Sequence, residues 1–581
     1  MRLHASITAI TLGAIALRFL LLLGRGDYVA FDEGWYLLLG RSLWTGEGYS
    51  LVGTPHLTLS PLFPLLAGGV GRLIGDWLWG GRLVAAVASG LLVLPVWSLV
   101  RRWSGERTAL AVAAIVAVTP SLAPFVAAYW VGADLWVGAE PLLHVFLFAG
   151  LALWARALDA DRRRWWGLAG LLLAAAFLAR PEALGVVGIL VLWSAGSALR
   201  RRSRARAVGT GLLLATFAVT ASPYWIRLYA HTGTWRLTGR EVDATSALRM
   251  NDARSRSAAS DIERMLLVDD GSYEARLYSL DPSGLRMQSA YWGVVSTGEM
   301  AASTAASTAV PPESADREAH TGAPTGAARE PDEAPTLTRA VSVAAVTMLP
   351  VWAWVIAAIG LLVTLRRPRA SSERGATVAL LATSATIALV AAVDARTQLF
   401  LVPLLILWMS RGVEWIAHTM ESRLSDLRPG FVHRITLAAI GLAGLGTLGW
   451  QLTLSRTVGS PHHVVGAQNR AVGEALDSLL DGRRGPIASW HPAIAVFADR
   501  DWRPLPLAPL PETVRYEQAA GAVAMVLSAY YPPTRGQELL GTRYTLIPVP
   551  SGVPTLVDWG LTRVDGDSLI TRARLIDRST P

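Results

Sequence analysis

Long runs of apolar residues, separated by short polar segments, follow one another along most of the chain. They lie at about residues 5–23, 77–100, 108–128, 139–155, 165–179, 181–198, 207–229, 339–365, 376–393, 397–410 and 435–454. A run of about 20 apolar residues can cross the hydrocarbon core of a bilayer as an α-helix. The pattern predicts an all-α polytopic membrane protein with about eleven transmembrane helices.

Arginine residues are concentrated in alternate connections between these runs. If the N-terminus is cytoplasmic and each run crosses once, the inner connections are 101–107, 156–164, 200–206, 366–374 and 411–434. These connections hold the arginine clusters, as the positive-inside rule requires. We therefore expect a multi-pass protein of the plasma (inner) membrane, with a cytoplasmic N-terminus and an extracytoplasmic C-terminal segment.

Three outer segments are too long to be simple turns. The first outer loop, 24–76, contains an apparent amphipathic helix at Phe31–Trp44 and an apolar piece at Pro61–Ile74, both suited to the membrane interface. The second, 230–338, ends in an Ala/Ser/Thr/Pro/Glu tract at 301–335 that has too little apolar surface to fold alone.

The third outer segment follows the last apolar run. It has a helix-like stretch and short apolar runs separated by turn residues, which predicts a small extracytoplasmic α/β domain. The predicted domains are thus a transmembrane domain, 1–454, and a C-terminal domain, 455–581.

Composition agrees with a membrane protein and removes several kinds of chemistry. The chain is 52% hydrophobic and 17% charged, whereas soluble proteins carry about 25% charged residues. It has no cysteine, which excludes disulfides and thiolate metal sites. All 53 basic residues are arginine, so any phosphate must be held by guanidinium groups. Because the arginines follow the topology, the basic charge does not indicate nucleic acid.

Ionisable residues from separate spans meet the membrane at its predicted outer face. They are Asp32, Glu33, Arg82, Glu140, Arg180 and Arg396. Ionisable groups at membrane depth are costly and mark functional sites. Because a transport path would place them near the midplane, their position at one face favours an active site at the outer interface.

Such a site fits group transfer from a lipid-phosphate donor. An aspartate can accept the proton of an attacking hydroxyl as a general base. Arginines can hold the phosphate oxygens in bidentate contacts and stabilise the leaving phosphate.

Short motifs in the first 410 residues resemble, in type and in order, those of the polyprenyl-phosphate-sugar-dependent glycosyltransferases of GT-C fold. That family includes the protein O-mannosyltransferases and the lipid A aminoarabinose transferase. The motifs are Phe31-Asp-Glu-Gly-Trp-Tyr36, Gly46-Glu-Gly-Tyr49, Ser60-Pro-Leu-Phe-Pro64, Arg82-Leu-Val, Glu140-Pro-Leu, Leu178-Ala-Arg-Pro-Glu182, Pro223-Tyr-Trp-Ile-Arg227 and Arg396 to Pro403.

The resemblance implies a role for each candidate residue. Asp32 would be the catalytic base, with Glu33 shaping the same site, and Glu140 would support the acceptor or the sugar. Arg82, Arg180 and Arg396 would contact the donor phosphate. The implied reaction inverts the anomeric carbon and needs no cofactor, and a divalent metal is not indicated.

The implied partners are a polyprenyl-phosphate sugar donor, membrane lipids, and a lipid, glycan or protein acceptor. Two other function classes stay open. A transporter or lipid flippase would show internal repeats and midplane charges, and we find neither. A non-catalytic GT-C-like scaffold of cell-envelope assembly would tolerate loss of the Asp32 carboxylate. Arg18, inside the first span, either faces the donor or extends towards the interface.

Overall fold

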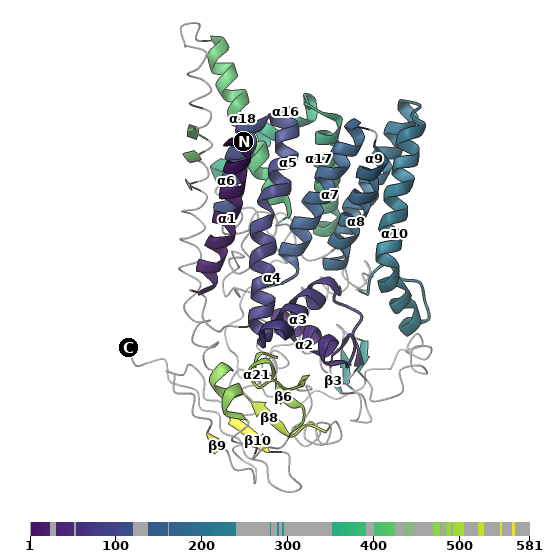
Figure 1. Cartoon of the computed structure of the whole chain (residues 1–581), viewed down its shortest axis with the longest axis vertical. Coiled ribbons are helices and arrows are strands. Elements are labelled where there is room, and N and C mark those ends of the chain that lie inside the picture. The colour runs from purple at the N-terminus through teal and green to yellow at the C-terminus, as the bar shows by residue number, and fades with distance from the viewer. Residues whose placement is uncertain are drawn as a thin grey trace, which may run out of the picture.

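A bundle of helices that alternate in direction forms most of the molecule (Figure 1). The computed structural model describes residues 2–23, 29, 31–51, 54–119, 138–160, 162–239, 351–390 and 400–423, with shorter stretches inside 279–295, 435–446 and 469–563. The bundle helices are α1 (Arg2–Leu23), α4 (Trp77–Leu91), α5 (Val93–Ser104), α6 (Glu106–Val118), α7 (Glu140–Ala160), α8 (Arg163–Ala179), α9 (Ala183–Arg200), α10 (Arg204–Thr232), α16 (Val351–Arg366), α17 (Ser371–Val390) and α18 (Val402–Arg423).

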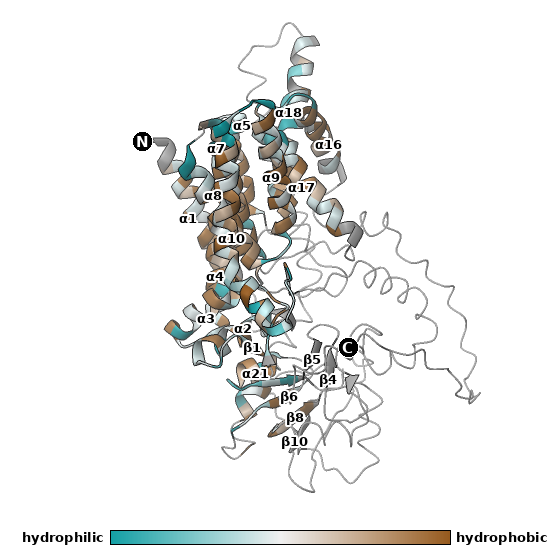
Figure 2. Cartoon of the chain, turned by 90° about the vertical axis from the view of Figure 1, so that its right-hand side faces the viewer, coloured by the Kyte–Doolittle hydropathy of each residue, from teal (hydrophilic) through white to brown (hydrophobic). Residues whose placement is uncertain are grey.

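The predicted apolar runs form helices wherever the structure describes them. Among the described residues, four helices are long and apolar enough to cross a membrane, namely Trp77–Ser104 (α4 and α5 together), Glu140–Ala160, Ala183–Arg200 and Arg204–Thr232. Hydrophobic residues cover the middle of the bundle, and hydrophilic residues gather at its end near α5 and α18 (Figure 2). The expectation of a mostly helical chain is confirmed, whereas the last predicted run, 435–454, lies largely outside the described residues.

Two helices, α2 (Phe31–Thr45) and α3 (Leu62–Ile74), lie across one end of the bundle (Figure 1). We call this the α2 end; it also holds the first turns of α7 and α9 and the last turns of α8 and α10. The helix predicted at Phe31–Trp44 is therefore present, and the apolar piece at Pro61–Ile74 also forms a helix. Small residues let α3 approach α2 closely, since a Cβ atom on Gly40 would lie 2.8 Å from the Pro64 carbonyl oxygen.

The described strands form three small sheets. Strands β1 (Ser50–Leu51) and β2 (Thr54–Pro55) make a hairpin after α2, and β3 (Ser279–Leu280), β4 (Met287–Ser289) and β5 (Gly293–Val295) form an antiparallel sheet. The third sheet has the order β7-β6-β8-β10-β9, with β6 parallel to β7 and β8. We call this sheet and helix α21 (Ala493–Phe497) the C-terminal unit; its strands are β6 (Ile487–Ser489), β7 (Trp502–Pro504), β8 (Ala524–Leu527), β9 (Ile547–Pro548) and β10 (Gly560–Arg563).

Arg18 is a structural link inside the bundle. Its buried guanidinium donates to the Ser89 hydroxyl of α4 at 3.1 Å and to the carbonyls of Val116 and Ala117 at the end of α6. The carbonyls at a helix end lack partners inside the helix, and an arginine supplies them. This guanidinium therefore joins three helices, an arrangement that neither sequence-based alternative for Arg18 anticipated.

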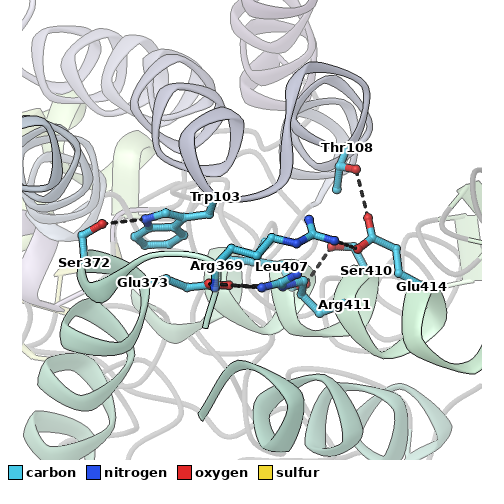
Figure 3. A network of polar contacts seen from close by, with 9 residues as sticks. All are labelled: Trp103, Thr108, Arg369, Ser372, Glu373, Leu407, Ser410, Arg411 and Glu414. Atoms are coloured by element: carbon cyan, nitrogen blue, oxygen red, sulfur yellow. Dashed lines mark hydrogen bonds and ion pairs between the residues drawn. The ribbon is translucent and has the colours of Figure 1, made fainter. Parts of the chain in front are cut away.

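A polar network fastens the end of the bundle opposite to α2 (Figure 3). Glu373, at the start of α17, is fully buried and accepts hydrogen bonds from the Arg411 guanidinium of α18 at 2.9–3.2 Å. Glu414, one turn further along α18, accepts from Thr108 of α6 at 3.1 Å and pairs with Arg369 at 2.9 Å. The network thus connects α17 and α18 to α6, an earlier part of the chain.

We expect Glu373→Ala to destabilise the protein strongly, because it leaves the Arg411 guanidinium buried without its carboxylate. Breaking such a buried pair costs about 3–5 kcal/mol, whereas an exposed pair contributes about 0–1 kcal/mol. The measurement is the apparent melting temperature in detergent micelles. Glu474→Ala, which removes the exposed Arg470–Glu474 pair, is the control. Equal melting temperatures for the two variants would contradict this account of the network.

Candidate active site

Helix α2 brings the first pair of candidate carboxylates to the α2 end. Asp32 and Glu33 are the second and third residues of the helix, where acidic residues interact favourably with the helix dipole. The Glu33 side chain is buried. The structure describes the backbone of Asp32 but not its side chain.

The loop after α2 folds back onto α10. Gly46 and Gly48 have φ values of 99° and 77°, which explains why glycine occupies both positions of the Gly-Glu-Gly-Tyr motif. The buried Tyr49 hydroxyl donates to the carbonyls of Leu59 and Ser60 at 3.1 and 3.3 Å. Arg227 of α10 donates to the Tyr49 carbonyl at 2.6 Å and lies 5.6 Å from the ring centroid. Burial raises the pKa of Tyr49 well above its usual value, so the hydroxyl stays protonated.

The turn between α8 and α9 carries a buried cluster of charges. Pro181 disfavours a helical backbone at the preceding residue, and Arg180 is accordingly extended, with φ −152° and ψ 136°. Its guanidinium donates to Glu140 at the start of α7, and to Glu182 at 2.7 and 3.2 Å. The Arg180 side chain is only 2% exposed. One guanidinium therefore ties α7 to the α8–α9 turn.

Electrostatics keep this guanidinium charged and connect it to α2. Burial alone would lower the pKa of Arg180, but the carboxylates of Glu182 and Glu140 outweigh it and raise the pKa well above its usual value. Tyr36 of α2 is also within electrostatic range of Arg180. Tyr36 follows Asp32 by four residues, and residues so spaced share one face of a helix. The α2 face that includes position 32 and Tyr36 lies on the side of α3, because the Tyr36 ring meets the Phe63 ring edge-on at 5.2 Å between centroids.

The structure brings two of the predicted site residues into direct contact. Glu140 and Arg180 form a direct ion pair. Arg82 is buried on α4, which contacts α2, and its guanidinium carbon lies 5.5 Å from the Trp79 ring centroid. Arg396 lies outside the described residues.

Sequence reasoning missed several residues at this end, and simple spacing could have found one of them. His144 is buried one turn after Glu140 on α7, within electrostatic range of Glu140 and Arg180. His56 is also buried, and its Nε2 accepts from the Leu59 amide at 2.9 Å. The i, i+4 spacing on α7 indicates the first; no local pattern indicates the second.

No metal centre is evident among the residues that the structure describes, since none of their His, Asp and Glu side chains group in threes. Asp159, which begins a DxD-like sequence at the end of α7, forms an ion pair with Arg102 at 2.5 Å. The charges at the α2 end that could hold an anion are guanidinium groups.

Comparisons with known proteins show what this chain is similar to. Residues 58–226 match the family model of dolichyl-phosphate-mannose-protein mannosyltransferase. No curated protein matches the chain by sequence. Among solved structures, the chain is similar to ArnT from Cupriavidus metallidurans bound to undecaprenyl phosphate, with a TM-score of 0.58, 12% identity, and 97% of this chain and 98% of that chain covered.

A second structural relative is the oligosaccharyltransferase from Archaeoglobus fulgidus in its apo form. Its TM-score is 0.54 at 12% identity, with 90% of this chain and 69% of that chain covered. At this identity the likeness establishes the fold. The resemblance to GT-C glycosyltransferases that the sequence motifs indicated is confirmed, and the family model matches the part of the chain that carries Arg82, Glu140 and Arg180.

Proposed function

We propose that this protein is an integral membrane glycosyltransferase that moves a sugar from a polyprenyl-phosphate donor to an acceptor hydroxyl at the extracytoplasmic face. The observation that carries this proposal is the buried cluster of Arg180 with Glu140 and Glu182, at the same end of a GT-C fold as α2. Buried ionisable groups concentrated at one membrane face suit an interfacial active site.

The proposed chemistry is a single displacement at the anomeric carbon. The acceptor oxygen bonds to that carbon while its proton passes to the Asp32 carboxylate, and the bond from the carbon to the phosphate oxygen breaks. The polyprenyl phosphate leaves as a stable anion, so no general acid is required. Attack from the face opposite to the phosphate inverts the configuration. Glu33 shapes the same site, and Glu140 supports the acceptor or the sugar.

Arg82, Arg180 and Arg396 are the proposed ligands of the donor phosphate. Arg180 already donates to two carboxylates, so a bound phosphate must share or displace them. Arg82 adds a second guanidinium, and Arg180 also orients Glu140. Because guanidinium groups neutralise the leaving phosphate, the proposed reaction uses neither a cofactor nor a metal.

The proposed topology completes the assignment. Eleven spans place the N-terminus in the cytoplasm and residues 455–581, which include the C-terminal unit, outside the plasma membrane. Two similar solved structures support the choice of substrates. The similar ArnT structure holds undecaprenyl phosphate, and a structure of the Archaeoglobus oligosaccharyltransferase, with a TM-score of 0.50, is tethered to an acceptor peptide. The fold favours this function over a transporter or flippase.

We expect Asp32→Asn to abolish sugar transfer, because the amide cannot accept the proton of the attacking hydroxyl. The measurement is release of polyprenyl phosphate by purified protein in lipid, with a panel of polyprenyl-phosphate sugars and membrane extract as acceptor. Release by the wild type that falls by at least about 100-fold in the variant is the expected result.

Two outcomes would count against this assignment. Equal release from both proteins would move the base away from Asp32. No release by the wild type with any donor, and donor binding unchanged in Asp32→Asn, would favour a non-catalytic scaffold.

We expect Glu182→Gln to strengthen donor binding. The change keeps the size of the side chain but removes one negative charge beside Arg180, and therefore reduces repulsion of the donor phosphate. The donor KM should fall by about tenfold, which corresponds to about 1.4 kcal/mol. Glu474→Gln, at an exposed pair of the C-terminal segment, should leave the donor KM unchanged. An unchanged or raised donor KM in Glu182→Gln would show that Arg180 is not a phosphate ligand.

A further inference from the structure

The C-terminal unit packs directly against the helix that carries Asp32 and Glu33. Gly34 of α2 lies beneath Pro492, the residue before α21, and a Cβ atom on this glycine would be 2.6 Å from the proline Cγ. Leu37 and Leu78 share a buried cluster with Ala493 of α21. The contact is thus close-packed at its centre and leaves no room for a side chain at position 34.

A charged contact lies two helical turns further along the same face of α2. Arg41 pairs with Asp501 and, at 3.5 Å, with Asp499, and its side chain is only 10% exposed. Asp499 also accepts a hydrogen bond from the Trp77 indole at the start of α4, at 3.2 Å. Both aspartates belong to the segment between α21 and β7, so this segment touches α2 and α4 together.

An aromatic contact completes the interface. Trp35 of α2 lies 6.3 Å, between ring centroids, from Trp502 of β7. Trp502 is buried, and its indole donates to the Ser489 carbonyl of β6 at 2.9 Å. The aromatic contact therefore extends from α2 into the sheet of the C-terminal unit.

Helix periodicity separates two functions on α2. Gly34, Leu37 and Arg41 recur at spacings of three and four, which is one face of an α-helix. Tyr36, whose ring meets the Phe63 ring of α3 edge-on at 5.2 Å between centroids, lies on the other side of the helix, and position 32 shares that side. Helix α2 is held between α3 and the C-terminal unit.

We propose that the C-terminal unit positions the carboxylates of α2. The positioning residues are Gly34, which packs against Pro492, and Arg41, which pairs with Asp499 and Asp501. The inference rests on the proposed function. A helix that lies across the bundle end can shift without unfolding any span, and a misplacement of about 1 Å at reacting groups can cost about 100-fold in rate. The unit acts on the rate of transfer, whereas the donor is bound by the arginines of the bundle.

The first test uses a steric pair. Gly34→Ala places a methyl group against Pro492 and should lower kcat by about 10- to 100-fold while the donor KM stays within about twofold. Pro492→Gly in the same protein removes the clashing atoms and should restore most of kcat. Gly188→Ala, in α9, is the matched control, because a Cβ atom there meets nothing within 4 Å.

The second test changes only the C-terminal unit. Asp499→Asn together with Asp501→Asn removes both negative charges that pair with Arg41, and asparagine tolerates the positive φ of 50° at position 499. The expected result is again a lower kcat with an unchanged donor KM. Glu474→Gln is the control. A kcat equal to that of the wild type in both sets of variants would overturn the positioning role, as would a loss confined to the donor KM.

Hydrogen exchange of the α2 amides on the same proteins separates failure of this inference from failure of the proposed function. If the wild type transfers no sugar, the proposed function is wrong. In that case the positioning role still predicts faster exchange of the α2 amides in Gly34→Ala. This faster exchange should be reversed by Pro492→Gly and should be absent in Gly188→Ala. Unchanged exchange in α2 would overturn the inference in that case too.

Discussion

A charge buried at the end of an apolar bundle must be neutralised where it lies, and this constraint shapes both ends of the molecule. Removing a charged group from water costs several kcal/mol, which is regained only by close partners of opposite charge. At the α2 end, Arg180 meets this requirement with Glu140 and Glu182, and at the opposite end Arg411 does so with Glu373. The Arg180–Glu140 and Arg411–Glu373 pairs each link different helices, so charge pairing also fixes how those helices pack.

Among the described residues, the α2 end carries α2, α3 and the C-terminal unit in addition to the bundle helices. Helix α2 crosses that end on small residues of α3 and carries Asp32 and Glu33 in its first turn. The C-terminal unit packs on its other side through Gly34 and Arg41. At the opposite end, the Glu373–Arg411 pair is enclosed by helices of the bundle. Because of this difference, we assign the chemistry to the α2 end and a stabilising role to the opposite end.

Much of this arrangement could be predicted from sequence, because helices in a membrane are defined by local apolar runs. The same reasoning placed Glu140 and Arg180 at one face, since topology follows from charge in the loops. Sequence reasoning could not predict that Glu140 and Arg180 form an ion pair, because the pair depends on the extended backbone of Arg180 before Pro181. Sequence reasoning also could not predict the contacts of Arg18 and Arg41. Their partners lie far along the chain, and no local pattern indicates such contacts.

The most direct test of the account asks whether the Arg180 cluster receives a lipid phosphate. The chain has no cysteine, so Glu182→Cys and Arg201→Cys each give a single thiol, at the two ends of α9. The measurement is the rate of maleimide labelling with and without polyprenyl phosphate, with polyprenol as the uncharged control. The account predicts that polyprenyl phosphate slows labelling at position 182 alone and that polyprenol has no effect. Unchanged labelling at position 182, or equal slowing at both positions, would contradict it.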